Sequence, residues 1–166
     1  MDGTKILGID PGLNITGYCV LSAAGNQFSI VEAGIVRSRQ RDPLTVRLKE
    51  IHDGISEVVL RLKPDMVGLE ELYSHYARPT TAIIMGHARG VICLACAQQN
   101  LTVHSYAATR IKKVLTGNGR APKSQVQLAV AQQLNLDAIP EPADVADAAA
   151  IAICHHFMSS RPESLL

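Results

Sequence analysis

The chain has 166 residues with a formal net charge of +1, and its 47% hydrophobic and 19% charged content fits one soluble domain with a single core. No apolar run approaches the roughly 18–20 residues that span a membrane and no signal peptide is recognised, so we expect a cytoplasmic protein. We predict one domain over residues 1–158 and a flexible C-terminal tail over residues 159–166.

The N-terminal third predicts three strands joined by short links. Residues 5–12 form an apolar run that ends in Asp10 and breaks at a Pro-Gly pair. Residues 15–22 give a second strand, residues 23–26 a turn, and residues 28–36 a third strand. Because the links are short, we expect an antiparallel meander.

A long helix and a fourth strand follow. Asp42 is the expected N-cap and Pro43 the first helical residue, and the helix should end before Pro64. Its apolar stripe is expected to consist of Leu44, Leu48, Ile51, Ile55, Val58 and Leu62. The fourth strand is short and ends in Glu70.

A loop at residues 72–79 leads into a helix over about residues 80–98 that is apolar on more than one side. We expect its main stripe at Ile83, Ile84, Val91 and Leu94, with Ala82, Met85, Ile92 and Cys96 on the flanks. A helix with so much apolar surface needs two partners. One is the sheet, and the other is either a second chain or the later helices of the same chain.

The C-terminal half predicts a fifth strand and three helices. Residues 101–105 should pair parallel to the fourth strand because a helix connects them. A short basic helix over residues 107–115, a turn at 116–120 and a helix opened by Pro122 with Val126, Leu128 and Val130 follow. The last helix begins at Pro142 and is rich in alanine, so its backbone can lie close to the sheet. The pattern predicts an α/β fold.

The four cysteines, Cys19, Cys93, Cys96 and Cys154, lie in apolar surroundings and are predicted to be buried reduced thiols. Cys93 and Cys96 have the spacing of a redox or zinc pair, but they fall within a helix and no second ligand pair completes a zinc site. We also interpret the histidines as packing or surface residues.

Four carboxylates occupy positions typical of a catalytic site. Asp10 and Glu70 end two strands, and Asp144 and Asp147 share one face of the last helix. If they converge, their repulsion requires a cation, and Mg²⁺ prefers such oxygen ligands. Two ions held there would favour phosphodiester hydrolysis. Each acid also has a structural explanation when taken alone. Asp10 can begin a turn, Glu70 can face solvent, and Asp144 and Asp147 are favourable in the first turns of a helix.

Residues 101–126 contain five basic residues and no acid, namely Arg110, Lys112, Lys113, Arg120 and Lys123.

The Gly-rich hairpin at residues 8–17 also resembles the first phosphate loop of the actin and sugar-kinase ATPases. Those proteins clasp a nucleotide between two domains, whereas this chain has room for one and lacks a second Gly-rich phosphate loop.

The order of motifs resembles the RuvC family of bacterial Holliday junction resolvases, which are ribonuclease H-like nucleases. The resemblance covers residues 5–156 and is carried by five motifs, which are Gly8-Ile9-Asp10-Pro11-Gly12 with Thr16-Gly17-Tyr18, Leu69-Glu70, Gly86-His87-Ala88-Arg89-Gly90, Lys123-Ser124-Gln125-Val126, and the segment at 143–153.

This resemblance implies a ribonuclease H-like fold with a five-stranded mixed sheet, three strands antiparallel and two parallel, flanked by helices. It implies a homodimer that makes paired cuts in four-way junction DNA during homologous recombination and repair. Two Mg²⁺ ions per site, replaceable by Mn²⁺, and a RuvA and RuvB branch-migration complex are the implied cofactors and partners. A related nuclease acting on other nucleic acid, such as a ribosomal RNA precursor, is the alternative.

The resemblance also implies roles for individual residues. Asp10, Glu70, Asp144 and Asp147 match the family's catalytic, metal-binding acids, and Lys112 and Lys123 match basic residues near the DNA backbone. Tyr73 stands where an aromatic residue stacks near the junction core, or else is anchored on the protein's own surface. The remaining expected DNA contacts are Arg78, Arg110, Lys113 and Arg120.

Overall fold

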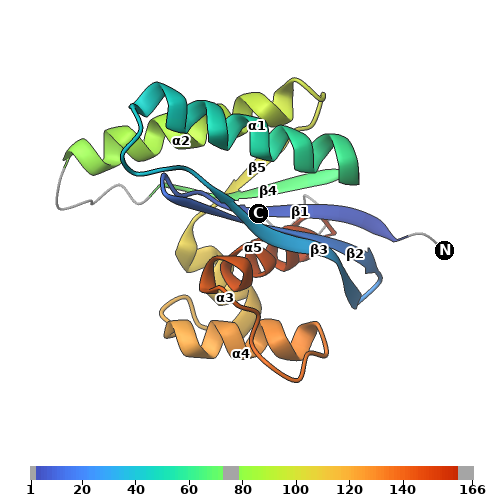
Figure 1. The fold of residues 1–166 in the computed structure, drawn as a ribbon. Coiled ribbons are helices and arrows are strands. Elements are labelled where there is room, and N and C mark those ends of the chain that lie inside the picture. Colours follow the sequence, from blue (N-terminus) through green and yellow to red (C-terminus); the bar gives the residue numbers. More distant parts are fainter. Residues whose placement is uncertain (1–2, 73–78, 161–166) are drawn as a thin grey trace.

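The computed structural model describes residues 3–72 and 79–160, so Tyr73, Arg78 and most of the predicted tail lie outside the described residues (Figure 1). A single five-stranded sheet in the order β3-β2-β1-β4-β5 forms its centre. β1 pairs antiparallel with β2 and β2 with β3, whereas β1–β4 and β4–β5 are parallel. This confirms the predicted mixed sheet. The strands are β1 (Thr4–Asp10), β2 (Ile15–Ala24), β3 (Gln27–Arg37), β4 (Met66–Glu70) and β5 (Val103–Tyr106).

Helices cover both faces of the sheet (Figure 1). One face carries α1 (Leu44–Leu62) and α2 (Pro79–Ala97), and the other carries α5 (Ala143–Ser159) with α3 (Ala108–Thr116) and α4 (Lys123–Gln133) beyond it. Each face has its own apolar core, one centred on Ile51, Ile55 and Ile92 and the other on Ile151 and Ile153. Of the apolar residues named for α4, Val126 and Val130 are buried, whereas Leu128 is 53% exposed.

Two predicted boundaries are wrong for local reasons. Asp42 does not cap α1, because its backbone N–H donates to the carbonyl of Arg39 and so closes a turn. Pro43 is the N-cap, and its carbonyl accepts the first bonds of the helix. In the β2–β3 hairpin the turn is Gly25-Asn26 alone, since Gly25 has a φ of 60° and a two-residue turn suffices.

The predicted main stripe of α2 is wrong at Ile83 and Leu94, whereas Val91 is partly buried against the core. The buried residues of this helix are Ala88, Ile92, Ala95 and Cys96, whereas Ile83 is 61% exposed and Leu94 51% exposed. The smaller residues face α1 and the sheet, where they permit close packing. Ile83 and Leu94 are therefore left on the outer face.

By length and composition alone, α2 is apolar enough to cross a membrane, which corrects the expectation that no segment approaches that size. Only 22% of its most apolar stretch is buried in the domain. However, α2 packs along α1, and Arg89 on it is hydrogen-bonded to the end of β4. We interpret α2 as a helix of the folded domain with one uncovered apolar face.

The four cysteines are not joined by disulfide bonds, and Cys19, Cys96 and Cys154 are buried as predicted, whereas Cys93 is only partly buried. Burial raises the pKa of the Cys19 and Cys96 thiols to about 12. Because the thiolate is the reactive form, this argues against the redox interpretation of Cys93 and Cys96.

Close contact between α5 and the sheet depends on glycines in three strands. A Cβ on Gly8 of β1 would lie 2.1 Å from the carbonyl oxygen of Ala148. A Cβ on Gly17 of β2 would lie 2.2 Å from the carbonyl oxygen of Asp144, and one on Gly68 of β4 would lie 3.1 Å from Ile151. The predicted close approach of the last helix is thus confirmed.

We predict that Gly8→Ala destabilises the domain by about 1–3 kcal/mol or more, because the new methyl group meets backbone that has no room to relax. Urea denaturation would measure this change. Gly86→Ala is the matched control: it sits within α2 with only Leu72 at 3.9 Å, so it should be neutral or stabilising by up to about 1 kcal/mol. Equal stability of the two variants would contradict the packing argument.

Candidate active site

Asp10 and Glu70 are brought together by the sheet itself. Each is the last residue of its strand, β1 for Asp10 and β4 for Glu70. These strands are parallel neighbours with Ile9 opposite Leu69, so the two carboxylates follow as the next pair. Adjacent strands lie about 4.8 Å apart, and the two acids therefore share one point on the sheet edge.

Asp144 and Asp147 reach the same point from the first two turns of α5. The contact of Gly17 with Asp144 places the start of this helix against β2 beside Asp10. The pKa of Asp10 is raised to about 8, first by burial and then by the charges of Glu70, Asp147 and Asp144. Burial and Asp147 also raise the pKa of Glu70. The structure thus brings the other three predicted acids within electrostatic reach of Asp10.

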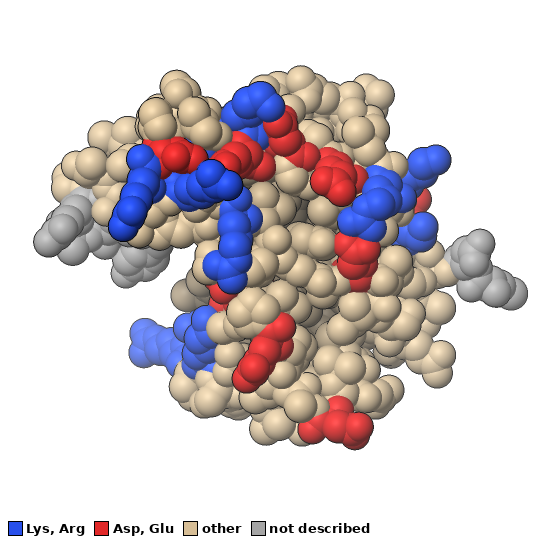
Figure 2. All heavy atoms as spheres, in the orientation of Figure 1, with Lys and Arg blue, Asp and Glu red and all other residues tan. Residues whose placement is uncertain are grey.

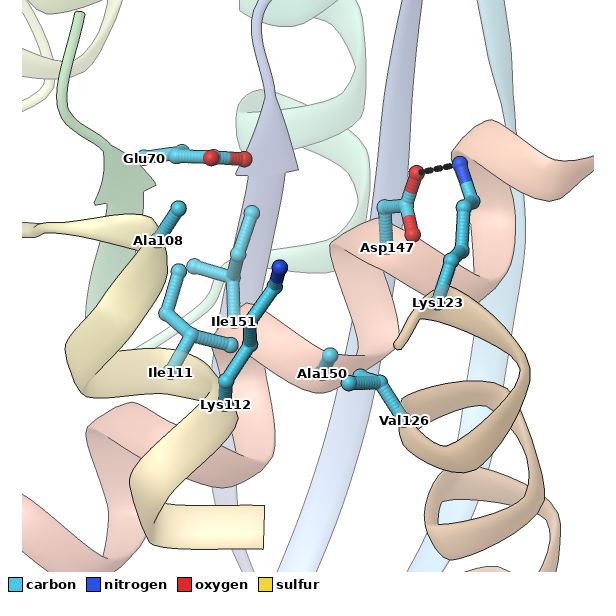
Figure 3. Close-up of a pocket in the computed structure, with 9 residues that line it drawn as sticks. All are labelled: Glu70, Ala108, Ile111, Lys112, Lys123, Val126, Asp147, Ala150 and Ile151. Atoms are coloured by element: carbon cyan, nitrogen blue, oxygen red, sulfur yellow. Dashed lines mark hydrogen bonds and ion pairs between the residues drawn. The ribbon is translucent and has the colours of Figure 1, made fainter. Parts of the chain in front are cut away.

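Two lysines offset part of this negative charge. Lys123 Nζ donates a hydrogen bond to Asp147 Oδ2 at 2.7 Å, and this contact raises the pKa of the lysine. Burial raises the pKa of Glu70, whereas the positive charge of Lys112 lowers it. Figure 3 shows Glu70 and Asp147 on opposite sides of one pocket, with Lys112 reaching into the space between them.

The pocket has a volume of about 260 Å³ and combines a charged mouth with an apolar floor. Its charged residues are Glu70, Lys112, Lys123 and Asp147 (Figure 3). Its apolar walls come from α3, α4 and α5, and consist of Ala108, Ile111, Val126, Ala150 and Ile151. The arrangement suits an anionic ligand whose phosphate meets the charges and whose less polar part meets the floor.

Arg89 and Tyr106 support the strand end that carries Glu70, and sequence reasoning did not assign either of them to the site. Arg89 Nε donates to the carbonyl oxygen of Glu70 at 3.3 Å, and its guanidinium also donates to Ser105. Tyr106 pairs with Glu70 in the sheet, and its hydroxyl lies 2.7 Å from Nδ1 of buried His155. The Gly86–Gly90 motif was the available signal for Arg89.

His155 is 1% exposed and serves a packing role, as expected for the histidines. Burial is the first cause that lowers its pKa to about 4, so the ring is neutral at physiological pH. Burial also raises the pKa of Tyr106 to about 12. The hydroxyl therefore donates to the imidazole, and the bond ties β5 to α5.

Three of the other predicted DNA contacts, Arg110, Lys113 and Arg120, are not among the residues that line this pocket. Arg110 and Lys113 are exposed on α3, and Arg120 is exposed in the turn before α4. Tyr73 and Arg78 belong to the segment between Glu70 and α2 that falls outside the described residues.

The donor set fits a hard divalent cation. Four carboxylates supply only oxygen ligands, and the pKa of Asp10 is raised first by burial and then by repulsion from the other three acids, which a cation would relieve. Within residues 3–72 and 79–160, no three His, Cys, Asp or Glu side chains are grouped closely enough to hold an ion as they stand. Mg²⁺ commonly uses one or two carboxylates with substrate phosphate, so a preassembled cage is not required.

Residues 6–155 match the family described as crossover junction endodeoxyribonuclease RuvC. The chain is 60% identical over 157 residues to the RuvC of Rhodopirellula baltica, covering 95% of this chain and 88% of that protein. It also resembles the structure of Thermus thermophilus RuvC (TM-score 0.87, 31% identity, 94% and 95% of the two chains). The same protein in complex with a Holliday junction substrate gives a TM-score of 0.89 at 30% identity, with 94% of each chain covered.

We predict that the metal-free protein loses stability as the pH rises from about 4 to about 8. In that window the folded state keeps the proton on Asp10, whose pKa is about 8, while the unfolded chain, with a pKa of 3.8, has lost it. Asp10→Asn removes this penalty, and we expect its melting temperature in chelator to exceed that of the wild type by about 4–8 °C at pH 8, corresponding to about 2 kcal/mol.

The difference between the two melting temperatures should shrink as the pH falls towards and below 4, because the unfolded chain, with a pKa of 3.8, then also takes up the proton. The control is Asp137→Asn, which removes an exposed acid from the loop between α4 and α5. A stability gain for Asp10→Asn that is independent of pH would contradict the assignment.

Proposed function

The chain belongs to the RuvC family of crossover junction endodeoxyribonucleases, and we propose that it resolves Holliday junctions by hydrolysing one phosphodiester bond in each of two opposing strands. The observation that carries this proposal is the gathering of four carboxylates at one sheet edge beside Lys112 and Lys123. This chemistry belongs to DNA recombination and repair. The ATPase and RNA-processing alternatives are not favoured.

The family is metal-dependent, and we propose two Mg²⁺ ions, replaceable by Mn²⁺, held by Asp10, Glu70, Asp144 and Asp147. When bound, such ions activate a water and stabilise the leaving oxygen of the phosphodiester. The protein side of the site must first give up a proton, since the pKa of Asp10 is about 8 in the free protein. Cation binding and deprotonation of Asp10 are therefore coupled.

The lysines act on the substrate phosphate. Lys112 and Lys123 place two ammonium groups at the mouth of the pocket, where negative charge grows on the phosphate during hydrolysis. Lys123 is already oriented by Asp147, so little reorganisation is needed when DNA arrives. Arg110, Lys113 and Arg120 extend the positive surface to neighbouring phosphates, and Tyr73 and Arg78 are proposed contacts near the junction core.

We propose that two copies of the chain associate through the uncovered face of α2. A junction is resolved cleanly by two symmetric nicks, and a two-fold dimer supplies two identical sites related by the symmetry of the substrate. Ile83 and Leu94 give this face its largest exposed apolar side chains. We also propose that the enzyme acts in the cytoplasm. A RuvA and RuvB branch-migration complex would deliver the junction to it there.

We predict that Asp10→Asn, Glu70→Gln, Asp144→Asn and Asp147→Asn each abolish cutting of a synthetic four-way junction and keep junction binding near wild type. Loss of a cation ligand disables hydrolysis, while the basic residues that hold phosphates remain. Gel-shift and cleavage assays with and without Mg²⁺ on the same junction measure both properties. Normal cutting by any of these variants would remove that residue from the site.

We predict that Leu94→Glu converts the dimer into a folded monomer that nicks junctions without pairing its cuts, because the substitution buries an unpaired charge at the interface. Sedimentation at micromolar concentration measures the association state. Leu60→Glu is the matched control, since Leu60 is 55% exposed on α1 and lies outside the proposed interface. If both variants remain dimeric, or the wild type is a monomer, another surface must be considered.

A further inference from the structure

We propose that Arg37, Arg39 and Arg41 form a second contact with the DNA backbone, on the other side of Asp10 from Glu70. We call residues 37–41 the arginine segment. Sequence reasoning had assigned DNA contacts only to the loop after Glu70 and to residues 101–126. This inference rests on the proposed function and extends its substrate contacts to a junction arm that the pocket does not reach.

The strand registers place the arginine segment on the catalytic edge of the sheet. Asp10 pairs with Gly17 of β2, and Ile15, two residues nearer the edge, pairs with Arg37 of β3. Two strand spacings of about 4.8 Å and two residues of about 3.3 Å separate the backbones of Asp10 and Arg37 by about 12 Å. A phosphate bound there belongs to DNA flanking the scissile bond.

The backbone of the arginine segment is fixed to the loop that follows Asp10. Ser38 N donates to the carbonyl oxygen of Asn14 at 3.0 Å, and Ser38 Oγ donates to the carbonyl oxygen of Leu13. Arg39 N donates to Glu50 Oε2 at 3.1 Å. The segment is therefore ordered before any ligand binds, which lowers the entropy cost of binding.

The three guanidinium groups are available to a ligand. Arg37, Arg39 and Arg41 are exposed, while Ser38 between the first two is buried. Within residues 3–72 and 79–160, none of the three forms an ion pair, in contrast to Arg61, which pairs with Glu32. Guanidinium groups bind phosphate oxygens with two parallel hydrogen bonds, so a DNA backbone is a fitting partner.

A buried arginine lies behind this surface. Arg47 of α1 is 8% exposed, and its guanidinium donates to Ser38 Oγ at 3.1 Å and to Asn14 Oδ1. Both acceptors are neutral, and no described acid forms an ion pair with Arg47. Arg47 therefore adds a positive charge behind the segment, where Glu50, which accepts from Arg39 N, is the neighbouring acid.

Figure 2 shows Lys and Arg side chains, with Asp and Glu side chains among them, over the end of β3 and the start of α1, and a second group of Lys and Arg over the start of α4. The visible surface is hollowed between the two groups, and acidic side chains appear within the hollow. A polyanion entering this hollow would meet positive charge on both sides. The active site thus has two basic rims, one from Lys112 and Lys123 and the other from the arginine segment.

The test is the salt dependence of junction binding. The logarithm of the binding constant falls as the logarithm of the salt concentration rises. We expect Arg37→Gln, Arg39→Gln and Arg41→Gln each to make this slope less steep by about 0.9, and the triple variant to make it less steep by about 3. The cleavage rate at saturating protein should be unchanged, because these residues do not touch the reacting atoms. Lys63→Gln is the matched control: Lys63 is exposed just before β4 begins, at the opposite sheet edge, and its slope should equal that of the wild type.

An unchanged slope in the triple variant, with wild-type protein that binds and cuts the junction, overturns this inference and leaves the proposed function intact. If the triple variant keeps the wild-type slope but its cutting is no longer stimulated by a branch-migration protein, the segment binds a protein partner. That result also overturns this inference. A wild-type protein that neither binds nor cuts the junction removes the proposed function, and this inference with it. Melting temperatures equal to that of the wild type exclude misfolding as the cause of a lower slope.

Discussion

The active site depends on direct contact between a helix and the backbone of the sheet. Asp side chains have a single methylene, so Asp144 and Asp147 reach the strand ends only if α5 lies unusually close. The glycines of β1 and β2 remove the Cβ atoms that would hold the helix away, and the alanines of α5 complete the contact. The same packing encloses the apolar core on this face. Catalytic geometry and the folding of the domain therefore rest on one interface.

That interface concentrates charges that oppose one another. Burial and three neighbouring carboxylates raise the pKa of Asp10 to about 8, so the free protein holds a proton where the proposed cation site needs an anion. Lys123 relieves part of this repulsion through Asp147. The destabilisation that remains is offset by the two apolar cores, which lie on either side of the sheet and contain no acid. Local destabilisation of this kind is typical of functional sites and is compensated elsewhere in the fold.

The elements that sequence patterns predicted well are those governed by local chemistry. Alternating and apolar runs gave the strands, and strand ends located Asp10 and Glu70. The errors arose where a contact that the local pattern does not show decided the outcome, either a neighbouring turn or a packing partner in another helix. Asp42 was drawn into a turn by Arg39, and the inner face of α2 was chosen by the packing of α1, which a helix apolar on several sides does not reveal. The support that Arg89 gives to Glu70 joins residues 19 apart and leaves no periodic signal.

Helix α2 connects the catalytic edge to the proposed interface between two chains. Arg89 holds the carbonyl oxygen of Glu70 from one side of this helix, while Ile83 and Leu94 face outwards from another. An α-helix is stiff over these few turns, so displacement of the outer face would move the group that holds Glu70. In the proposed dimer, the contact that sets the separation of the two sites would thus also orient a catalytic acid within each. Pairing of the cuts then follows from one rigid element rather than from communication between flexible loops.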